Sequence, residues 1–165
     1  MKYVLDSSCF INTNSLNFEE SETYTTPSVI KELKDFKSKA LLNIINPEII
    51  KPKKECLKIV KEKAKKTGDI NVLSETDIEV IALGIEIEGI VVSDDFDVQN
   101  ICEELRIDWR SISGTNIKKL FKREKYCPAC GKKFKNTFEG NTCNICGHKL
   151  KYRVVKTKKL KTKKT

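Results

Sequence analysis

Two cysteine pairs near the end of the chain most constrain what it can fold into. Residues 127–131 read Cys-Pro-Ala-Cys-Gly and residues 143–147 read Cys-Asn-Ile-Cys-Gly. Four thiolates at this spacing converge on one Zn²⁺ at about 2.3 Å each, and a glycine after each pair suits a tight turn. Because sulfur would fill every coordination position, the metal would organise a small module without doing chemistry. We predict one structural zinc held by Cys127, Cys130, Cys143 and Cys146. The alternatives are two disulfides or four unrelated thiols.

The chain of 165 residues has room for this module and one further domain of ordinary size. The N-terminal segment 1–6 reaches a charge before the apolar region of a signal peptide could form. No run approaches the roughly eighteen apolar residues of a membrane span. We expect a soluble, cytoplasmic protein with no membrane partner, and seven cysteines, an odd number, argue against a disulfide framework there.

Charge is divided unevenly along the chain. Residues 1–116 carry 15 Lys/Arg and 21 Asp/Glu, a net charge of −6, whereas residues 117–165 carry 17 and 2, a net charge of +15. The basic part stays near +13 after four thiolates bind one Zn²⁺, so nucleic acid is its expected partner. Residues 151–165 hold eight of the basic residues and no acid. We expect this tail to be disordered, or ordered only on binding; the alternative is a solubilising end.

Short apolar runs alternate with helix patterns over residues 1–112. Strands are expected at Tyr3–Leu5, Ile90–Ser93 and Ile107–Ile112. A Thr26-Pro27 pair opens a helix with Val29, Ile30, Leu33 and Phe36 on its apolar side, and further helices are expected over 53–66, from Ser74 to near Gly89, and over 98–105. Residues 113–125 are expected to form a linker with a basic helical piece. The alternation predicts the α/β class with a mainly parallel sheet.

Acidic side chains follow two of the expected strands. Asp6 ends the first strand, and Asp94 and Asp95 end the strand over 90–93. Parallel strands present their carboxyl ends at one edge, and the early turns of two helices add Glu32 and Asp77 there. Such a set suits Mg²⁺ or Mn²⁺ and phosphodiester hydrolysis by a two-metal mechanism, which needs no catalytic histidine. Taken singly, Asp77 has a simpler explanation as a capping-box residue and Glu32 as an ordinary exposed glutamate.

The order of these acids resembles that of the PIN-domain ribonucleases. The matching segments are Leu5–Ile11, Thr26–Glu32, Leu73–Asp77 and Ser93–Asp97, so the resemblance covers about residues 1 to 112. It implies a PIN-like domain that uses Mg²⁺ or Mn²⁺, with catalytic and metal-binding carboxylates at Asp6, Glu32, Asp77 and Asp95. Asp94 is equally close to the strand end, and the choice between Asp94 and Asp95 as the fourth ligand stays open.

A PIN-like domain followed by a zinc ribbon, with Ser93–Asn100 at the fourth acid, is similar to the Nin-one-binding family in its short, archaeal-type form. This resemblance implies an endoribonuclease that cuts single-stranded RNA to mature the 3′ end of small-subunit (16S-type) ribosomal RNA. Its implied partners are ribosomal RNA, the pre-small ribosomal subunit and other assembly factors. The expected domains are a nuclease domain (1–116), a basic linker (117–125), a zinc ribbon (126–150) and a Lys-rich tail (151–165).

Two other functions compete with this one. A toxin-type PIN ribonuclease would share the four acids but would usually lack a ribbon, so the cysteine pairs count against it. A catalytically inactive, zinc-ribbon RNA-binding assembly factor would be expected to have lost carboxylates, whereas all four candidate acids are present. Metal-dependent cleavage of a short RNA separates an enzyme from a scaffold.

Overall fold

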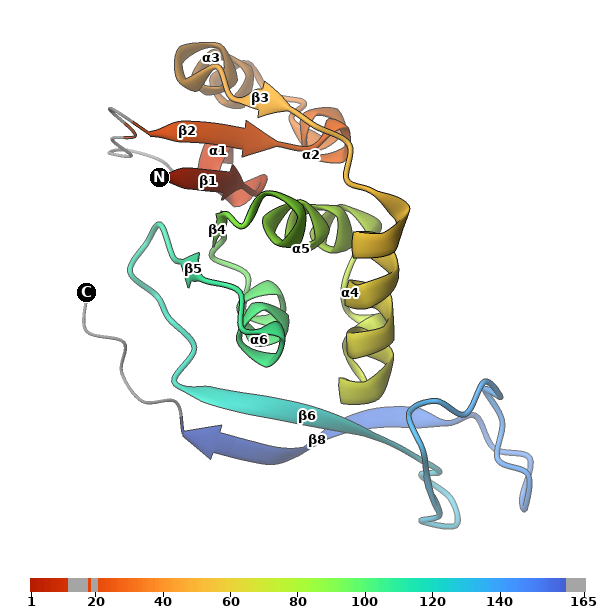
Figure 1. Ribbon diagram of the computed structural model, residues 1–165. Coiled ribbons are helices and arrows are strands. Elements are labelled where there is room, and N and C mark those ends of the chain that lie inside the picture. The colour runs from red at the N-terminus through yellow and green to blue at the C-terminus, as the bar shows by residue number, and fades with distance from the viewer. Residues whose placement is uncertain (12–17, 19–20, 160–165) are drawn as a thin grey trace.

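The N-terminal part of the chain forms a parallel sheet, as predicted. The computed structural model describes residues 1–11, 18 and 21–159, and in it five parallel strands lie in the order β3-β2-β1-β4-β5 (Figure 1). The strands are β1 (Lys2–Leu5), β2 (Glu22–Thr25), β3 (Glu48–Ile49), β4 (Ile90–Val92) and β5 (Trp109–Arg110). Tyr3 lies opposite Thr23 on one side and Ile90 on the other, so β1 is central. The α/β prediction is confirmed.

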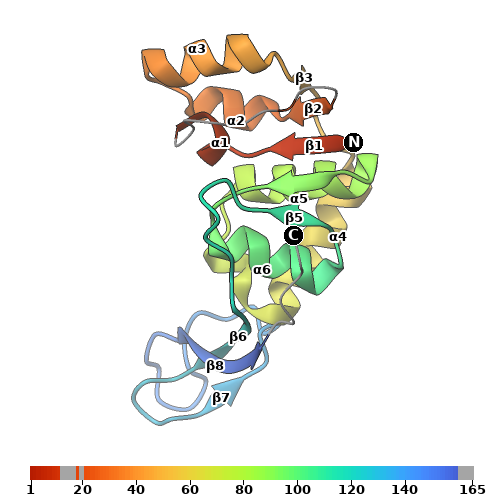
Figure 2. The ribbon, with the colours of Figure 1, turned by 90° about the vertical axis from the view of Figure 1, so that its left-hand side faces the viewer.

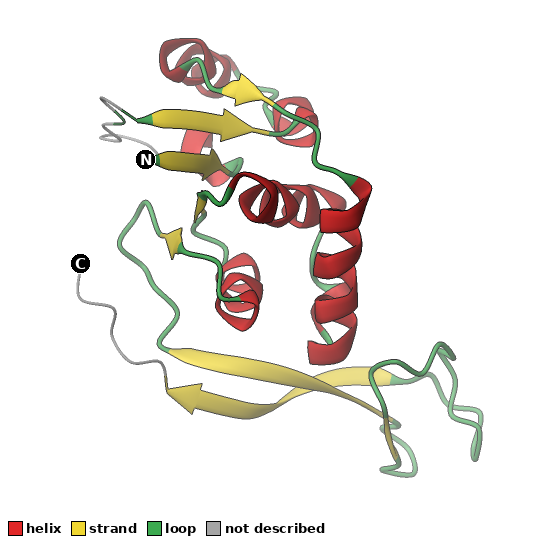
Figure 3. Cartoon of the chain, viewed as in Figure 1, coloured by secondary structure: helices red, strands yellow, loops and turns green. Residues whose placement is uncertain are grey.

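Helices connect and cover the strands. They are α1 (Ser8–Ile11), α2 (Pro27–Glu32), α3 (Phe36–Ile45), α4 (Lys54–Thr67), α5 (Glu75–Ile87) and α6 (Phe96–Leu105), with a 3₁₀ turn at Asp69–Asn71 (Figure 3). Local sequence sets several ends: Thr26 caps α2, Ser74 caps α5, and α4 stops at Gly68 in the left-handed conformation (φ +86°). Helix α5 packs on β1 and β4, while α4 packs on α5 and α6.

The expected helix after Thr26 is shorter than predicted. It ends at Glu32, because Leu33 takes extended backbone angles, and Phe36 begins α3 instead of extending α2. Asp35 causes this restart: its carboxylate accepts hydrogen bonds from the Ser38 backbone N–H and hydroxyl, which makes a new helix cap. The Phe36 side chain is 89% exposed, so its predicted place on an apolar helix face is wrong.

One hydrophobic core fills the space between the sheet and its helices. Its fully buried side chains come from the central strands and from α5 and include Val4, Leu5, Phe10, Ile81, Leu83 and Val91. Strands as apolar as β1 and β4 are expected where helices cover a parallel sheet. Among the helices that the structure describes, none combines the length and apolar character needed to span a membrane.

A second, antiparallel sheet lies beside this domain, at the end of the molecule away from α3 (Figures 1 and 2). Its strands are β6 (Lys119–Tyr126), β7 (Lys133–Phe134) and β8 (Lys151–Lys159), in the order β7-β6-β8. The expected basic helical piece within 113–125 is therefore wrong, since most of that segment is a strand. The expected disorder of the tail is wrong for 151–159, and its last residues, 160–165, lie outside the described part.

The charge of these strands is offset locally, which explains why basic segments can pair. Glu124 accepts ion pairs from Lys133 at 3.0 Å and from Arg153 at 3.0 Å. The Arg153 guanidinium also lies 4.4 Å from the centre of the Tyr126 ring, a cation–π contact. Aromatic residues such as Tyr126 favour strands, and the ion pairs of Glu124 offset part of the repulsion between the basic side chains.

Candidate active site and cysteine cluster

Asp6 lies at the centre of the candidate site. It follows β1 directly and is only 4% exposed. Its Oδ1 accepts a hydrogen bond from the Ser7 backbone N–H at 2.6 Å, and its Oδ2 accepts from the hydroxyls of Ser8 at 3.1 Å and Ser93 at 2.7 Å. Burial raises the pKa of Asp6, the hydrogen bonds act to lower it, and the charge of Asp95 adds to the rise. The ends of β1 and β4 therefore meet as predicted.

Asp77 contributes to the same site from the first turn of α5. It completes a capping box, in which its Oδ2 accepts from the Ser74 backbone N–H at 2.7 Å. Burial raises the pKa of Asp77 to about 6 against those hydrogen bonds, and the charges of Asp6 and Asp95 raise it further. The structure confirms the capping box, and the same carboxylate lies within electrostatic reach of two other candidate acids. Its role as a metal ligand stays a prediction.

The two neighbouring acids after β4 have different surroundings. Asp95 caps α6, and its Oδ1 accepts from the Asp97 backbone N–H at 2.6 Å. Asp94 turns to another loop, where its Oδ1 accepts from the Ser111 hydroxyl and the Ile112 N–H at 2.8 Å each and from the Ser113 N–H at 3.1 Å. Burial acts to raise the pKa of Asp94, but these hydrogen bonds outweigh it and lower the pKa. Asp95, not Asp94, is the acid whose charge acts on both Asp6 and Asp77.

Glu32 is the last residue of α2 and is exposed. It lies one turn beyond Ser28, whose hydroxyl donates to the Glu79 carboxylate of α5, so the shared face of α2 is turned toward α5. The charges of Asp6 and Asp95 both raise the pKa of Asp77, and the charge of Asp95 raises that of Asp6, so these three carboxylates lie near one another. The place of Glu32 in the site stays a prediction.

The charge of this group is not balanced within the protein. Among the described residues, no lysine, arginine or histidine forms an ion pair with Asp6, Asp77 or Asp95. Carboxylates that repel one another in a partly buried site favour a bound proton or a cation, and oxygen ligands suit a hard divalent ion. The oxygen atoms of these acids do not all lie within 4.8 Å of one another, unlike the sulfur atoms of the cysteine group.

The four predicted cysteines form a tight cluster. Their sulfur atoms all lie within 4.8 Å of one another, and the Cys127–Cys146 and Cys130–Cys143 Sγ distances are 3.4 and 3.6 Å. Four sulfurs tetrahedral about one zinc at 2.3 Å would stand about 3.8 Å apart, so the cluster fits this ion. All seven cysteines lie in the described part of the chain and none of them forms a disulfide there, which excludes the disulfide alternative.

The thiols of the cluster shift one another's pKa because they lie so close together. The Cys130 backbone N–H lowers the pKa of the Cys127 thiol. Burial acts to raise the pKa of Cys143, but hydrogen bonds led by the Cys146 and Ile145 backbone N–H groups lower it to about 6. The His148 backbone N–H acts to lower the pKa of Cys146, yet the neighbouring thiols raise it to about 12. Neighbouring sulfurs thus share protons until a metal replaces them.

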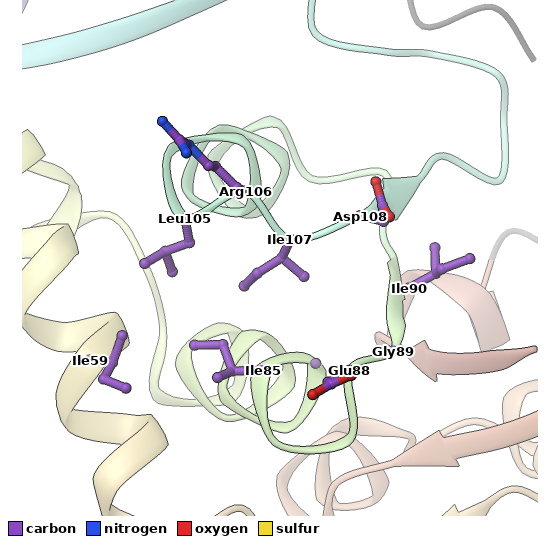
Figure 4. Close-up of a pocket in the computed structure, with 10 residues that line it drawn as sticks. Ile59, Ile85, Glu88, Gly89, Ile90, Leu105, Arg106, Ile107 and Asp108 are labelled. Atoms are coloured by element: carbon purple, nitrogen blue, oxygen red, sulfur yellow. The ribbon is translucent and has the colours of Figure 1, made fainter.

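A pocket of about 360 Å³ lies away from the carboxylates (Figure 4). It is lined by the ends of α5 and α6, the start of β4 and one residue of α4, including Ile59, Ile85, Leu105 and Ile107. These segments meet at the amino end of the sheet, whereas parallel α/β folds place their sites at the carboxyl end. The pocket contains none of the predicted site residues.

Sequence reasoning did not assign roles to the side chains that orient the acids. Ser8 and Ser93 donate to Asp6, and Ser111 donates to Asp94. The serines next to Asp6 and Asp94 in the chain were a usable signal, since hydroxyl groups beside buried carboxylates are natural donors. The Ser111–Ser113 loop gave no such signal, because it lies 17 residues from Asp94.

Comparison with known proteins decides the family. The family model described as the PIN domain of ribonuclease matches residues 3–87. Endoribonuclease Nob1 of Pyrococcus abyssi is 41% identical over 155 residues, which cover 92% of each chain. The chain belongs to the Nob1 family of PIN-domain endoribonucleases. The prediction that it is an enzyme, and the resemblance on which that prediction depended, are confirmed.

Two other relatives of this Nob1-family protein mark the range of the similarity. Ribonuclease VapC1 of Thermoplasma acidophilum is 35% identical over 165 residues, covering 97% of this chain and 82% of the relative. The 20S-pre-rRNA D-site endonuclease nob1 of Schizosaccharomyces pombe is 40% identical over 88 residues, covering 52% of this chain and 23% of that protein.

Proposed function

We propose that this Nob1-family protein cuts single-stranded RNA to mature the 3′ end of the small-subunit (16S-type) ribosomal RNA, on the pre-small ribosomal subunit in the cytoplasm. The observation that carries the proposal is the match to endoribonuclease Nob1 of P. abyssi over 92% of both chains. The S. pombe relative, named for an endonuclease site in 20S pre-rRNA, supports the substrate class. Other assembly factors of the pre-small subunit are proposed partners.

The carboxylate group supports a metal-dependent reaction. We propose that Asp6, Asp77 and Asp95, with Glu32, hold Mg²⁺ or Mn²⁺. Bound ions of this kind lower the pKa of a water toward neutrality and stabilise the leaving oxygen. Asp94 is proposed to act indirectly, by holding the 111–113 loop.

The side chains around the acids prepare the site for those ions. Serine hydroxyls and backbone N–H groups fix the Asp6 carboxylate from both of its oxygens. The Ser93 hydroxyl also accepts from the Asp95 backbone N–H at 3.1 Å, so one serine links the two acids. Ligands held by a second set of hydrogen bonds keep their orientation when the charge around them changes.

The basic part of the chain supports the delivery of RNA. Residues 1–116 carry a net charge of −6 and would repel a polyanion, whereas residues 117–165 carry +15 before metal binding. We propose that the sheet of β6, β7 and β8, with one structural Zn²⁺ on Cys127, Cys130, Cys143 and Cys146, contacts RNA phosphates.

The test is cleavage of a single-stranded RNA that carries the rRNA 3′-end sequence, with Mg²⁺ or Mn²⁺ and in EDTA. One metal-dependent cut near the mature end is expected, and Asp6→Asn should reduce its rate at least about 100-fold because the central ligand is lost. A scrambled RNA of equal length is the control. Equal cleavage of both RNAs would favour the toxin-type alternative, and no cleavage of either would overturn the proposal.

A further inference from the structure

Strand β6 and the segment just before it are attached to the nuclease domain by buried amide side chains. Gln99 of α6 is fully buried. Its Nε2 donates to the backbone carbonyls of Ser93 at 2.9 Å and Thr115 at 3.3 Å, and its Oε1 accepts from the Ile117 N–H at 2.9 Å. A buried amide that satisfies main-chain groups on both sides fixes their separation, because leaving any of them unpaired costs about 1–3 kcal/mol.

The next residue, Asn100, repeats this arrangement one step along β6. It is also fully buried, and its Nδ2 and Oδ1 pair with the Phe121 carbonyl at 3.1 Å and the Phe121 N–H at 3.0 Å. Its Nδ2 also donates to the buried Asp69 carboxylate at 3.2 Å. The Arg123 guanidinium of β6 then pairs with both Asp69 and Asp97.

Close backbone packing adds a contact at the end of α4. A Cβ atom on Gly68 would lie 2.8 Å from the Arg123 carbonyl oxygen and 2.9 Å from the Asn136 Nδ2. That amide donates to the Arg123 carbonyl at 2.8 Å and to the Lys66 carbonyl at 3.2 Å. We call Gly68, Asp69, Gln99, Asn100, Arg123 and Asn136 the β6 anchor; Figure 1 shows the ends of α4 and α6 beside the strand it holds.

The β6 anchor lies next to the acid group. Asp95 caps α6, and Gln99 follows it by four residues, which is about 6 Å along a helix. Gln99 also holds the carbonyl of Ser93, the residue whose hydroxyl donates to Asp6. Asp97 connects the two sets directly, since its N–H donates to Asp95 and its carboxylate pairs with Arg123. One short helix therefore carries both a proposed metal ligand and the attachment of the basic sheet.

We propose that the β6 anchor selects which phosphodiester bond is cut. The inference depends on the proposed function, because it assumes that the basic sheet holds the RNA and that the acids cut it. With the anchor intact, β6 has one position relative to Asp6 and Asp95, so RNA held there presents one linkage. Without it, the covalent connection through residues 113–118 would give β6 more freedom, since six extended residues span about 20 Å, enough for several neighbouring linkages.

Two variants loosen the anchor without touching an acid or a basic residue. Gly68→Ala introduces a clash with β6. Asn100→Leu keeps the branched side-chain shape but removes both bonds to Phe121 and the bond to Asp69. Gly114→Ala is the matched control for Gly68→Ala, because its φ is also positive (+75°) but nothing lies within 4 Å of the added Cβ. Insertion of Gly-Ser-Gly-Ser after Gly114 is a second control, since it lengthens the connection and leaves the anchor in place.

The readout is the position of the cut, mapped on the RNA that carries the rRNA 3′ end. Wild type, Gly114→Ala and the insertion should give one cut at the same linkage. Gly68→Ala and Asn100→Leu should spread cleavage over two or more neighbouring linkages, while the RNA Kd changes less than about twofold because the cationic side chains are untouched. Faster amide exchange at Phe121 would verify that the anchor is loosened.

The outcomes separate this inference from the proposed function. An unchanged cut position in variants whose Phe121 amide exchanges faster would overturn the inference, and so would a shift of the cut by the Gly114 insertion. Where Gly68→Ala or Asn100→Leu fails to fold, the insertion can still overturn the inference, because a shifted cut would show that the connecting segment sets the position. Wild-type protein that does not cut the RNA would overturn the proposed function itself.

Discussion

At the scale of single residues, Asp77 shows how one carboxylate serves two purposes. It completes the capping box of α5 through the Ser74 N–H, and it lies near enough to Asp6 and Asp95 for their charges to raise its pKa. The cap fixes the side chain before any metal binds. Placing Asp77 in the site therefore adds little conformational entropy cost, because the cap already orders its side chain. The unfavourable part is the burial of its negative charge near two other carboxylates.

The first prediction concerns the pH dependence of the metal-free protein. The folded-state pKa of Asp77 is about 6, above its ordinary 3.8, so the folded state binds the proton more tightly and stability falls as pH rises from about 4 to 6. Asp77→Asn should remove this loss, raising stability at pH 7 by about 1 kcal/mol after allowance for solvent screening. Urea unfolding at pH 4 and pH 7 measures it. Mn²⁺ should stabilise wild type more than the variant; an equal effect would argue against Asp77 as a ligand.

The second prediction separates the two neighbouring acids. Asp95→Asn should reduce cleavage at least about 100-fold with little loss of stability, because it removes charge from the metal site. Asp94→Asn should keep most of the activity but lower stability by about 1 kcal/mol, because the charged acceptor of three hydrogen bonds becomes neutral. Initial rates and thermal melting of both variants provide the measurement. The reverse pattern would make Asp94 the ligand.

At the scale of elements, local signals were predictable and distant ones were not. The capping box at Ser74, the stop at Gly68 and the strand that ends at Asp6 each depend on residues within one turn or strand, so the sequence alone identified them. The state of residues 119–126 depends instead on Asn100, Gln99 and a partner strand that begins at Lys151. The sequence of residues 119–126 could form a helix or a strand, and these contacts make it a strand.

The same distinction applies to the candidate site. The order of acids along the chain predicted the meeting of Asp6, Asp77 and Asp95, because strand ends and helix starts share one edge in a parallel sheet. It could not separate Asp94 from Asp95, since that choice depends on a loop 17 residues farther along. Nor could it predict that α2 ends at Glu32, because that end depends on the extended backbone of Leu33 and on the new helix that the Asp35 cap begins.

The third prediction concerns the cysteine module. Removing zinc with a chelator, or making Cys130→Ser, should unfold residues 127–149, because so small a segment has no core without its metal. Residues 117–123 should stay protected, since Gln99, Asn100 and Asp69 hold them independently of the cysteines. Amide hydrogen exchange reports both regions in one experiment. Simultaneous loss of protection at Phe121 would show that zinc also maintains the anchor.

At the scale of the whole molecule, the two charged parts are joined by a buried polar interface. That the nuclease function ends at residue 116 and RNA binding begins after it stays a prediction. The two parts are not separate in the fold, because the β6 anchor crosses this boundary: Asn100 and Asp69 lie before it and bond Phe121 and Arg123 after it. The basic part thus supplies the partners of polar side chains that are buried in the acidic part.

The fourth prediction follows for truncated chains. A fragment of residues 1–116 should be less stable than one of residues 1–126 by about 3 kcal/mol or more, because the shorter fragment leaves Asn100, Asp69 and one acceptor of Gln99 without partners. The longer fragment is the matched control, since it also lacks all four zinc ligands. Thermal or urea unfolding of the two fragments measures the difference. Equal stability would show that the interface adds nothing to the fold.

The central place of β1 also determines when the protein can act during its synthesis. Strand β1 is synthesised first, but it pairs with β4, which is synthesised much later. The Asp6 carboxylate accepts a hydrogen bond from the Ser93 hydroxyl, 87 residues farther along the chain. Contacts between residues so far apart in sequence slow folding. At about 5–20 residues per second, the ribosome also needs several seconds to synthesise the residues between them. The candidate site of a growing chain therefore cannot assemble until β4 and the cap of α6 have left the ribosome. The nascent protein is inactive while more than half of its length is being translated.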